Sequence, residues 1–262
     1  MTDNDNGIRG RIYFPGSPWP NGHQIASFNW TALLHPQYGS YISDASRRSP
    51  ALAMCFELTT EDYYAKDGTH LAAGEENEDD DDASSDDWRS RVVWNNYNKC
   101  WIGPSQTSSA PGIPVSDGTK PFDFTCDEYY FSANPLPVDW NNFFQEQAFG
   151  IYLLGHDAVA DHKIHLHSRQ PDGSYTLDWS GKIALYYAGE TDFEYDFIAR
   201  VEGVRFDAIS LFYVNPTWAK EYFGLDLDPN VTPHQRIAPF VANPDDFRIE
   251  ERNGVLHAVY RT

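Results

Sequence analysis

Apolar and polar side chains alternate through much of the second half of the chain, and this period of two is typical of half-buried strands. Residues 192–201 (DFEYDFIARV) show it clearly, with apolar side chains on one face and charged ones on the other, where Ile198 is the exception. Pro171-Asp172-Gly173 and Glu202-Gly203 supply turn residues between such runs. We therefore expect a four-stranded antiparallel meander made of residues 163–168, 174–189, 192–201 and 204–214.

The rest of the chain adds further strands. Asn253-Gly254 lies between two alternating runs and is a strong hairpin signal. Gly181 stands inside the apolar run WSGKIALYYAG and is expected to ease a β-bulge in an inner strand. In the first half, strand-like runs occur at residues 10–14, 24–34, 50–60, 90–102 and 122–132.

Two segments read as helices instead. Asn215 can cap a helix that has Pro216 at its first position and ends at Gly224. A second helix is expected over residues 138–150, with Asp139 as its cap. The pattern as a whole predicts a mainly β, β-rich α+β fold with antiparallel sheets and about two short helices. The sheets form either a two-sheet sandwich or one strongly curved sheet.

Long polar segments interrupt the first half without separating two cores. One is an acidic loop at residues 66–88, and the other is a loop at residues 103–121 that is rich in Pro, Gly and Ser. Strand-like sequence resumes after each, so we expect a single β-rich domain over residues 1–262. The alternative is two halves that divide near residues 133–140.

Composition narrows the range of functions. The chain of 262 residues is 41% hydrophobic and 15% aromatic, enough to bury a core, and carries a formal net charge of −20. Nine of its carboxylates lie between Glu75 and Asp87 in the acidic loop; without these nine, 30 acidic residues remain against 19 basic ones, a net charge of −11. A negative field repels phosphate backbones and anionic lipid and attracts basic proteins. We therefore expect a basic protein partner, and neither nucleic acid nor a membrane.

The cysteines and the N-terminal residues suggest a compartment. Cys55, Cys100 and Cys126 are an odd number of widely spaced thiols, as in proteins of a reducing compartment. Met1 is followed by neither a basic nor an apolar signal region, and no apolar run reaches the roughly 20 residues of a membrane helix. A cytoplasmic location is the expectation.

Histidines supply the densest group of metal-ligand types. In the run GHDAVADHKIHLHS, His165 and His167 would share one face of a strand and could hold zinc, iron or nickel together with Asp161. The same run also fits the solvated face of a hairpin. It supports an alternative function, a metal-dependent β-sandwich enzyme that uses the region of His162, His165 and His167.

A carbohydrate-active enzyme is another form of that alternative. Aromatic faces stack on sugar rings, and a pair of carboxylates can hydrolyse a glycosidic bond. Nothing in the sequence selects two carboxylates from a large set that includes Asp127, Glu128, Asp178, Glu194 and Asp196.

The sequence therefore favours a non-catalytic protein-binding module without a cofactor. No nucleophile or phosphate-binding motif is present, and the charge suits a partner of a basic protein, such as the immunity or inhibitor protein of a toxin. The residues expected to face that partner are nine carboxylates of the acidic loop: Glu75, Glu76, Glu78, Asp79, Asp80, Asp81, Asp82, Asp86 and Asp87.

Overall fold

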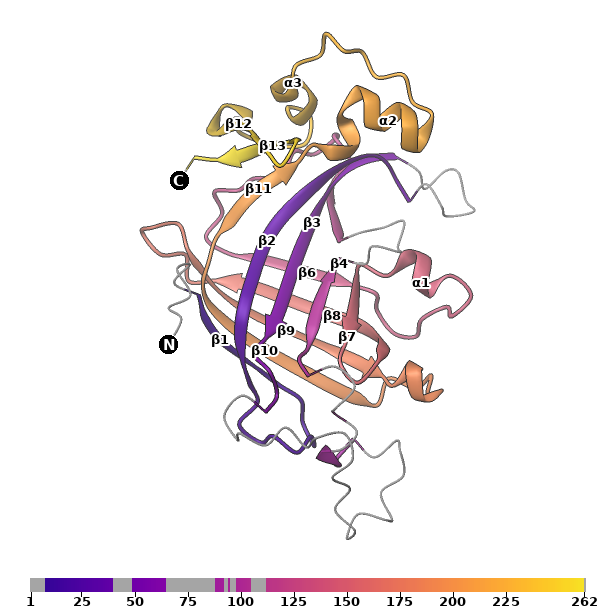
Figure 1. Cartoon of the computed structure of the whole chain (residues 1–262). Coiled ribbons are helices and arrows are strands. Elements are labelled where there is room, and N and C mark those ends of the chain that lie inside the picture. The colour runs from indigo at the N-terminus through magenta and orange to yellow at the C-terminus, as the bar shows by residue number, and fades with distance from the viewer. Residues whose placement is uncertain are drawn as a thin grey trace.

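The fold is an antiparallel sheet that closes on itself (Figure 1). The computed structural model describes residues 8–39, 49–64, 88–91, 94, 98–104 and 112–261. Eight strands form the ring, each antiparallel to the next, and the last pairs again with the first. In ring order they are β1 (Arg9–Tyr13), β2 (His23–Tyr38), β3 (Ser49–Thr60), β4 (Trp101–Pro104), β7 (Phe149–Tyr152), β8 (His156–His167), β9 (Tyr175–Ala184) and β10 (Tyr195–Val204).

Of the two expected architectures, the strongly curved sheet is nearer to this barrel than the two-sheet sandwich. β2 turns the sheet on itself because its 16 residues pair with β1 near one end and with β3 along most of their length. Strands from both sides of residues 133–140 pair directly, as in β1 with β10 and β4 with β7.

Five further strands lie outside the ring. β5 (Ile113–Ser116) pairs with β3 and lies within the segment that was expected to be a loop at residues 103–121. β6 (Tyr129–Ala133) pairs with β8. The remaining strands, β11 (Phe206–Ser210), β12 (Phe247–Arg252) and β13 (Val255–Tyr260), extend the sheet from β2.

The expected four-stranded meander is wrong in its last strand. β8, β9 and β10 are successive antiparallel neighbours. β11 leaves β10 and runs parallel to β2, with β13 on its other side. The hairpin at Asn253-Gly254 is confirmed: it joins β12 to β13, and both turn residues have positive φ, 53° and 80°.

The described residues contain three short α-helices. They are α1 (Phe143–Glu146), α2 (Pro216–Phe223) and α3 (Pro233–Ile237), and α2 and α3 lie over one end of the barrel (Figure 1). α2 is as predicted: the Asn215 side chain accepts a hydrogen bond from the Thr217 N–H at 2.9 Å, and Gly224 ends the helix at φ 67°. The helix expected over 138–150 is limited to α1, because the residues after it form β7 against β4.

Aromatic side chains fill the barrel. Trp30, Phe56, Phe149, Trp179 and Phe197 are at most 1% exposed and belong to one continuous core. An eight-stranded barrel can either hold one small ligand or be filled by its own side chains. Here the rings take up the interior, so side chains on the outer face and in the connections are the groups that can meet a ligand or partner.

Candidate functional site

A bulge in β8 determines which side chains reach the outer face. The pairing of β8 with β9 is interrupted so that Asp161 and His162 both lie opposite Gly181. Asp161 has a left-handed backbone, with φ 49°. A Cβ at Gly181 would lie 2.5 Å from a neighbouring ring carbon, so only glycine fits there. The bulge expected at Gly181 is confirmed, and the extra residue is on the partner strand.

The bulge reverses the alternation of β8. Before it, Val159 lies in the core; after it, Ile164 and Leu166 do. Without the extra residue, His165 and His167 would share a face with Val159 and point into the core. With it they point outward, and their side chains are 31% and 18% exposed.

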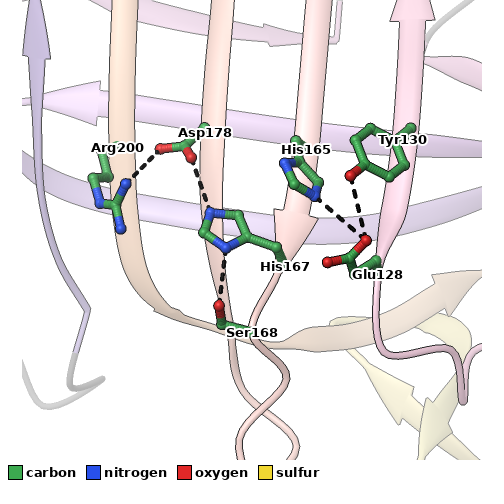
Figure 2. A network of polar contacts seen from close by, with 7 residues as sticks. All are labelled: Glu128, Tyr130, His165, His167, Ser168, Asp178 and Arg200. Atoms are coloured by element: carbon green, nitrogen blue, oxygen red, sulfur yellow. Dashed lines mark hydrogen bonds and ion pairs between the residues drawn. The ribbon is translucent and has the colours of Figure 1, made fainter.

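The outward histidines meet an aspartate on the neighbouring strand (Figure 2). Asp178 of β9 is the register partner of His165. His167 Nε2 lies 2.9 Å from Asp178 Oδ2, and the two imidazole rings are 4.6 Å apart between centroids. One ligand atom from each of the three residues lies within 4.8 Å of the others. Arg200 of β10 is 3.3 Å from the other oxygen of Asp178.

β6 borders the cluster on its other side (Figure 2). The ring of Tyr130 stacks on His165 at 4.0 Å with an interplanar angle of 16°. The Tyr130 hydroxyl donates a hydrogen bond to Glu128 Oε2 at 3.3 Å, and that oxygen is 4.0 Å from His165 Nε2. His165 Nε2 is buried and makes no hydrogen bond with any residue that the structure describes. We call His165, His167, Asp178 and Glu128 the outer-face cluster.

Two residues predicted for this region lie elsewhere. His162 points into the barrel, 1% exposed, where its Nδ1 accepts a hydrogen bond from Trp179 Nε1 at 3.2 Å. Burial lowers the pKa of His162 to about 3, so the ring is neutral. Asp161 sits in the bulge with its carboxylate 2.9 Å from Lys163 Nζ. The carboxylate that joins His165 and His167 is that of Asp178, which the sequence suggested only as one of many carboxylates.

A sequence signal for Asp178 exists in the hairpin turn. β8 and β9 are joined through Pro171-Asp172-Gly173, and counting back from a turn centred at Pro171 and Asp172 places His165 opposite Asp178. The outward direction of that pair has no comparable signal, because it depends on the bulge.

The acidic carboxylates expected to face a partner, Glu75 to Asp87, lie outside the described residues. The chain that follows them is described: the ring of Trp88 stacks on Tyr195 at 4.3 Å with an interplanar angle of 17°. Tyr195 begins β10, and the preceding connection carries Glu190, Asp192 and Glu194. Trp88 therefore lies at a barrel end that has carboxylates of its own.

Exposed aromatic rings lie in the same connection. Tyr186 and Tyr187, in the short 3-10 helix η3 (Tyr186–Ala188), are 42% and 68% exposed. Trp140 is stacked between Tyr186 and Phe193, 5.4 Å from each. We call the group formed by Trp140, Tyr186, Tyr187, Glu190, Asp192 and Glu194 the β9–β10 patch.

The β9–β10 patch is held against the barrel by the turn before β8. Tyr187 packs on Gly155, where an added Cβ would approach the ring to 2.5 Å. Asp157 fixes that turn by accepting hydrogen bonds from the backbone N–H groups of Leu154 and Gly155 at 3.0 and 3.1 Å. Burial raises the pKa of the Asp157 carboxyl above its ordinary value.

A pocket of about 230 Å³ lies beside the connection between β1 and β2. Its lining includes Trp19, His23, Tyr63 and Arg91. Trp19 contacts the rings of His23 and Tyr63, with centroids at 5.2 and 5.8 Å, and the Arg91 guanidinium lies 5.6 Å from its centroid. These contacts make Trp19 a packed side chain, which gives little support to a sugar-stacking platform at this pocket.

No protein-family model, curated protein or solved structure matches this chain, so geometry and chemistry alone bear on its function. Within the part of the chain that the structure describes, no helix has the length and apolar character needed to cross a bilayer.

Proposed function

We propose that this protein is a non-catalytic binding module that engages a basic protein partner through the β9–β10 patch. The observation that carries the proposal is the position of Tyr186 and Tyr187, exposed by 42% and 68%, in one connection with Glu190, Asp192 and Glu194. The net charge of −20 on the whole chain adds to the negative electrostatic potential around this connection.

Aromatic and acidic groups have separate roles in such an interface. Tyr and Trp are the residues that most often supply binding energy, because they bury a large area with few rotatable bonds. Carboxylates around them steer a basic partner to the surface and mainly raise the association rate. We expect Tyr187 to act as the anchor, and Glu190, Asp192 and Glu194 to guide the encounter.

The rigidity of the connection favours binding further. Tyr187 is seated on Gly155, and Trp140 is stacked between two rings, so the β9–β10 patch loses little conformational freedom when a partner binds. The carboxylates from Glu75 to Asp87 remain predicted partner contacts. A basic toxin, with this chain as its immunity or inhibitor protein, is the class of partner that fits.

The test is affinity capture from the source cell with matched variants. Wild type, Tyr187→Ala and a triple variant with Glu190, Asp192 and Glu194 changed to Gln or Asn are compared at low and moderate salt. The control is Tyr222→Ala, which removes another exposed tyrosine, 53% exposed, from α2. We expect a basic protein that wild type and the control retain and that both patch variants lose.

Kinetics with the captured partner then separate the two roles. The triple charge variant is expected to slow association and to reduce its dependence on salt, whereas Tyr187→Ala is expected to speed dissociation. Capture of the same basic protein by all four forms, or of none by wild type, would contradict the proposal.

A further inference from the structure

The structure assigns a second binding site to this chain: the outer-face cluster is a site for a divalent transition-metal ion of the zinc class. His165, His167 and Asp178 are its ligands, and Glu128, whose Oε2 lies 4.0 Å from His165 Nε2, is the candidate for a fourth. This inference is independent of the β9–β10 patch and of any protein partner.

Backbone register brings the ligands together without help from a loop. His165 and His167 are two residues apart on β8, and Asp178 faces His165 across the strand pair. Their ligand atoms lie within 4.8 Å of one another. Nitrogen and oxygen ligands of a tetrahedral ion lie about 3–4 Å apart, since each bond is about 2.0–2.2 Å long. Small side-chain rotations would bring the ligand atoms of His165, His167 and Asp178 to that spacing.

The ligand types select the ion. Two imidazoles and one or two carboxylates suit zinc, and also cobalt or nickel, whereas calcium and magnesium prefer oxygen alone. The buried Nε2 of His165 makes no hydrogen bond with any described residue and lies 4.0 Å from Glu128 Oε2. An ion bound there would satisfy both atoms.

Neighbouring groups hold the ligands in the manner usual for metal sites. Ser168 Oγ is 3.0 Å from His167 Nδ1, which leaves Nε2 of that ring for the ion. Arg200 forms an ion pair with Asp178 Oδ1 at 3.3 Å, which leaves Oδ2 to coordinate the ion. Tyr130 stacks on His165 and donates to Glu128, so it fixes two ligands at once.

Without an ion, the same residues make an ordinary network of cross-strand contacts. His167 and Asp178 form a hydrogen bond of 2.9 Å, and Arg200 is an ion-pair partner of Asp178. These two descriptions predict different outcomes when metal is added, and the difference can be measured directly.

The experiment is a zinc titration of the full, untagged, chelator-treated chain by calorimetry, because a histidine tag would compete. We expect one ion per chain. The double variant His165→Ala with His167→Ala should raise the dissociation constant at least ~100-fold, and Asp178→Asn should raise it at least ~10-fold, as when metal ligands or the groups that support them are lost. Glu128→Gln should cause a smaller loss. Cobalt should give a visible absorption band that the double variant lacks.

Two controls locate the ion. His156→Ala removes an exposed histidine from the same strand and should leave the dissociation constant within about 2-fold of wild type, since the histidine is outside the cluster. Replacing the four aspartates Asp79, Asp80, Asp81 and Asp82 by Asn should also leave the dissociation constant unaltered. Circular dichroism without metal confirms that each variant is folded. Failure of wild type to bind zinc, undiminished binding by the folded double variant, or loss of binding in either control would overturn the inference.

Discussion

One strand places chemically identical side chains in two different environments. On β8, His162 lies inside the barrel and is 1% exposed, while His165 and His167 lie on the outer face within reach of Asp178. Plain alternation from Val159 would put the outer pair inside. The single extra residue at the bulge produces the observed arrangement, so a local backbone irregularity determines which histidines can bind a ligand.

The two environments require different things of an imidazole. His162 is packed among the rings of Phe149, Trp179 and Phe197, with centroids 4.9 to 6.1 Å away, and it serves as a neutral core side chain. His165 stacks on Tyr130 of β6, and His167 forms a hydrogen bond with Asp178 of β9. Substitutions should therefore reduce stability at the inner position and ligand binding at the outer ones.

The largest expected effect comes from emptying the inner position. His162→Ala should lower the free energy of unfolding by about 2–4 kcal/mol. The substitution leaves a cavity among aromatic rings and removes the hydrogen-bond acceptor of the buried Trp179 N–H. The matched change on the outer face, His165→Ala, should cost no more than about 0.5 kcal/mol. Urea unfolding measures both. Equal losses would contradict the assignment of the two faces.

A smaller effect is expected from the bulge residue itself. Asp161→Val places a β-branched side chain at φ 49° and should cost about 1–3 kcal/mol, whereas Asp161→Gly should be nearly neutral because glycine adopts that φ freely. Unfolding midpoints of the two variants give the comparison. If valine were tolerated as well as glycine, the left-handed conformation would not be what maintains the bulge.

The inner histidine should also make stability depend on pH. Burial lowers the pKa of His162 to about 3, and those of His23 and His35 to about 4, from 6.5 in the unfolded chain. Below pH 6.5 the unfolded state therefore takes up protons that the folded state does not, and stability falls as the pH drops. Each of the three histidines should lower the free energy of unfolding by about 1 kcal/mol at pH 5.5, relative to neutral pH.

His162→Gln isolates one of these contributions. Relative to wild type, its loss of stability between pH 7.5 and 5.5 should be smaller by about 1 kcal/mol. The measurement is denaturant unfolding at both values. An unchanged pH dependence would mean that His162 takes up a proton as readily in the folded protein as in the unfolded chain. That result would contradict its role as a buried, neutral side chain.

A small effect is also expected at Asp178, on the outer face, without metal. Asp178→Asn weakens a hydrogen bond and an ion pair whose partners are partly exposed, so it should cost less than about 1 kcal/mol. Unfolding in the presence of a chelator measures this. A larger loss would make the Asp178 contacts a main support of the barrel instead of a ligand set.

Features determined by adjacent residues could be predicted from the sequence. Asn215, Pro216 and Gly224 specify the start and end of α2 through their own backbone preferences. Asn253-Gly254 specifies the last hairpin in the same way, and Gly181 indicated a bulge. In each case the information lies within a few residues.

Features determined by distant pairing could not. Phe149 and Gly150 were expected to end a helix but begin β7, because β4 offers them a strand edge. The closure of the barrel depends on β1 pairing with β10, as in Arg9 with Glu202, 193 residues further along the chain (202 − 9). The outward direction of His165 and His167 depends on one residue at the bulge, which strand alternation alone does not reveal.

The most direct test follows His162, His165 and His167 of β8 at once. Long-range nitrogen–proton NMR of protein labelled at histidine, assigned with the single variants, reports each imidazole during a zinc titration. We predict that the signals of His165 and His167 shift or broaden together up to one equivalent of zinc, while those of His162 stay unchanged. A shift at His162, or no shift at His165 and His167, would contradict the division of β8 into a packed inner face and a metal-binding outer face.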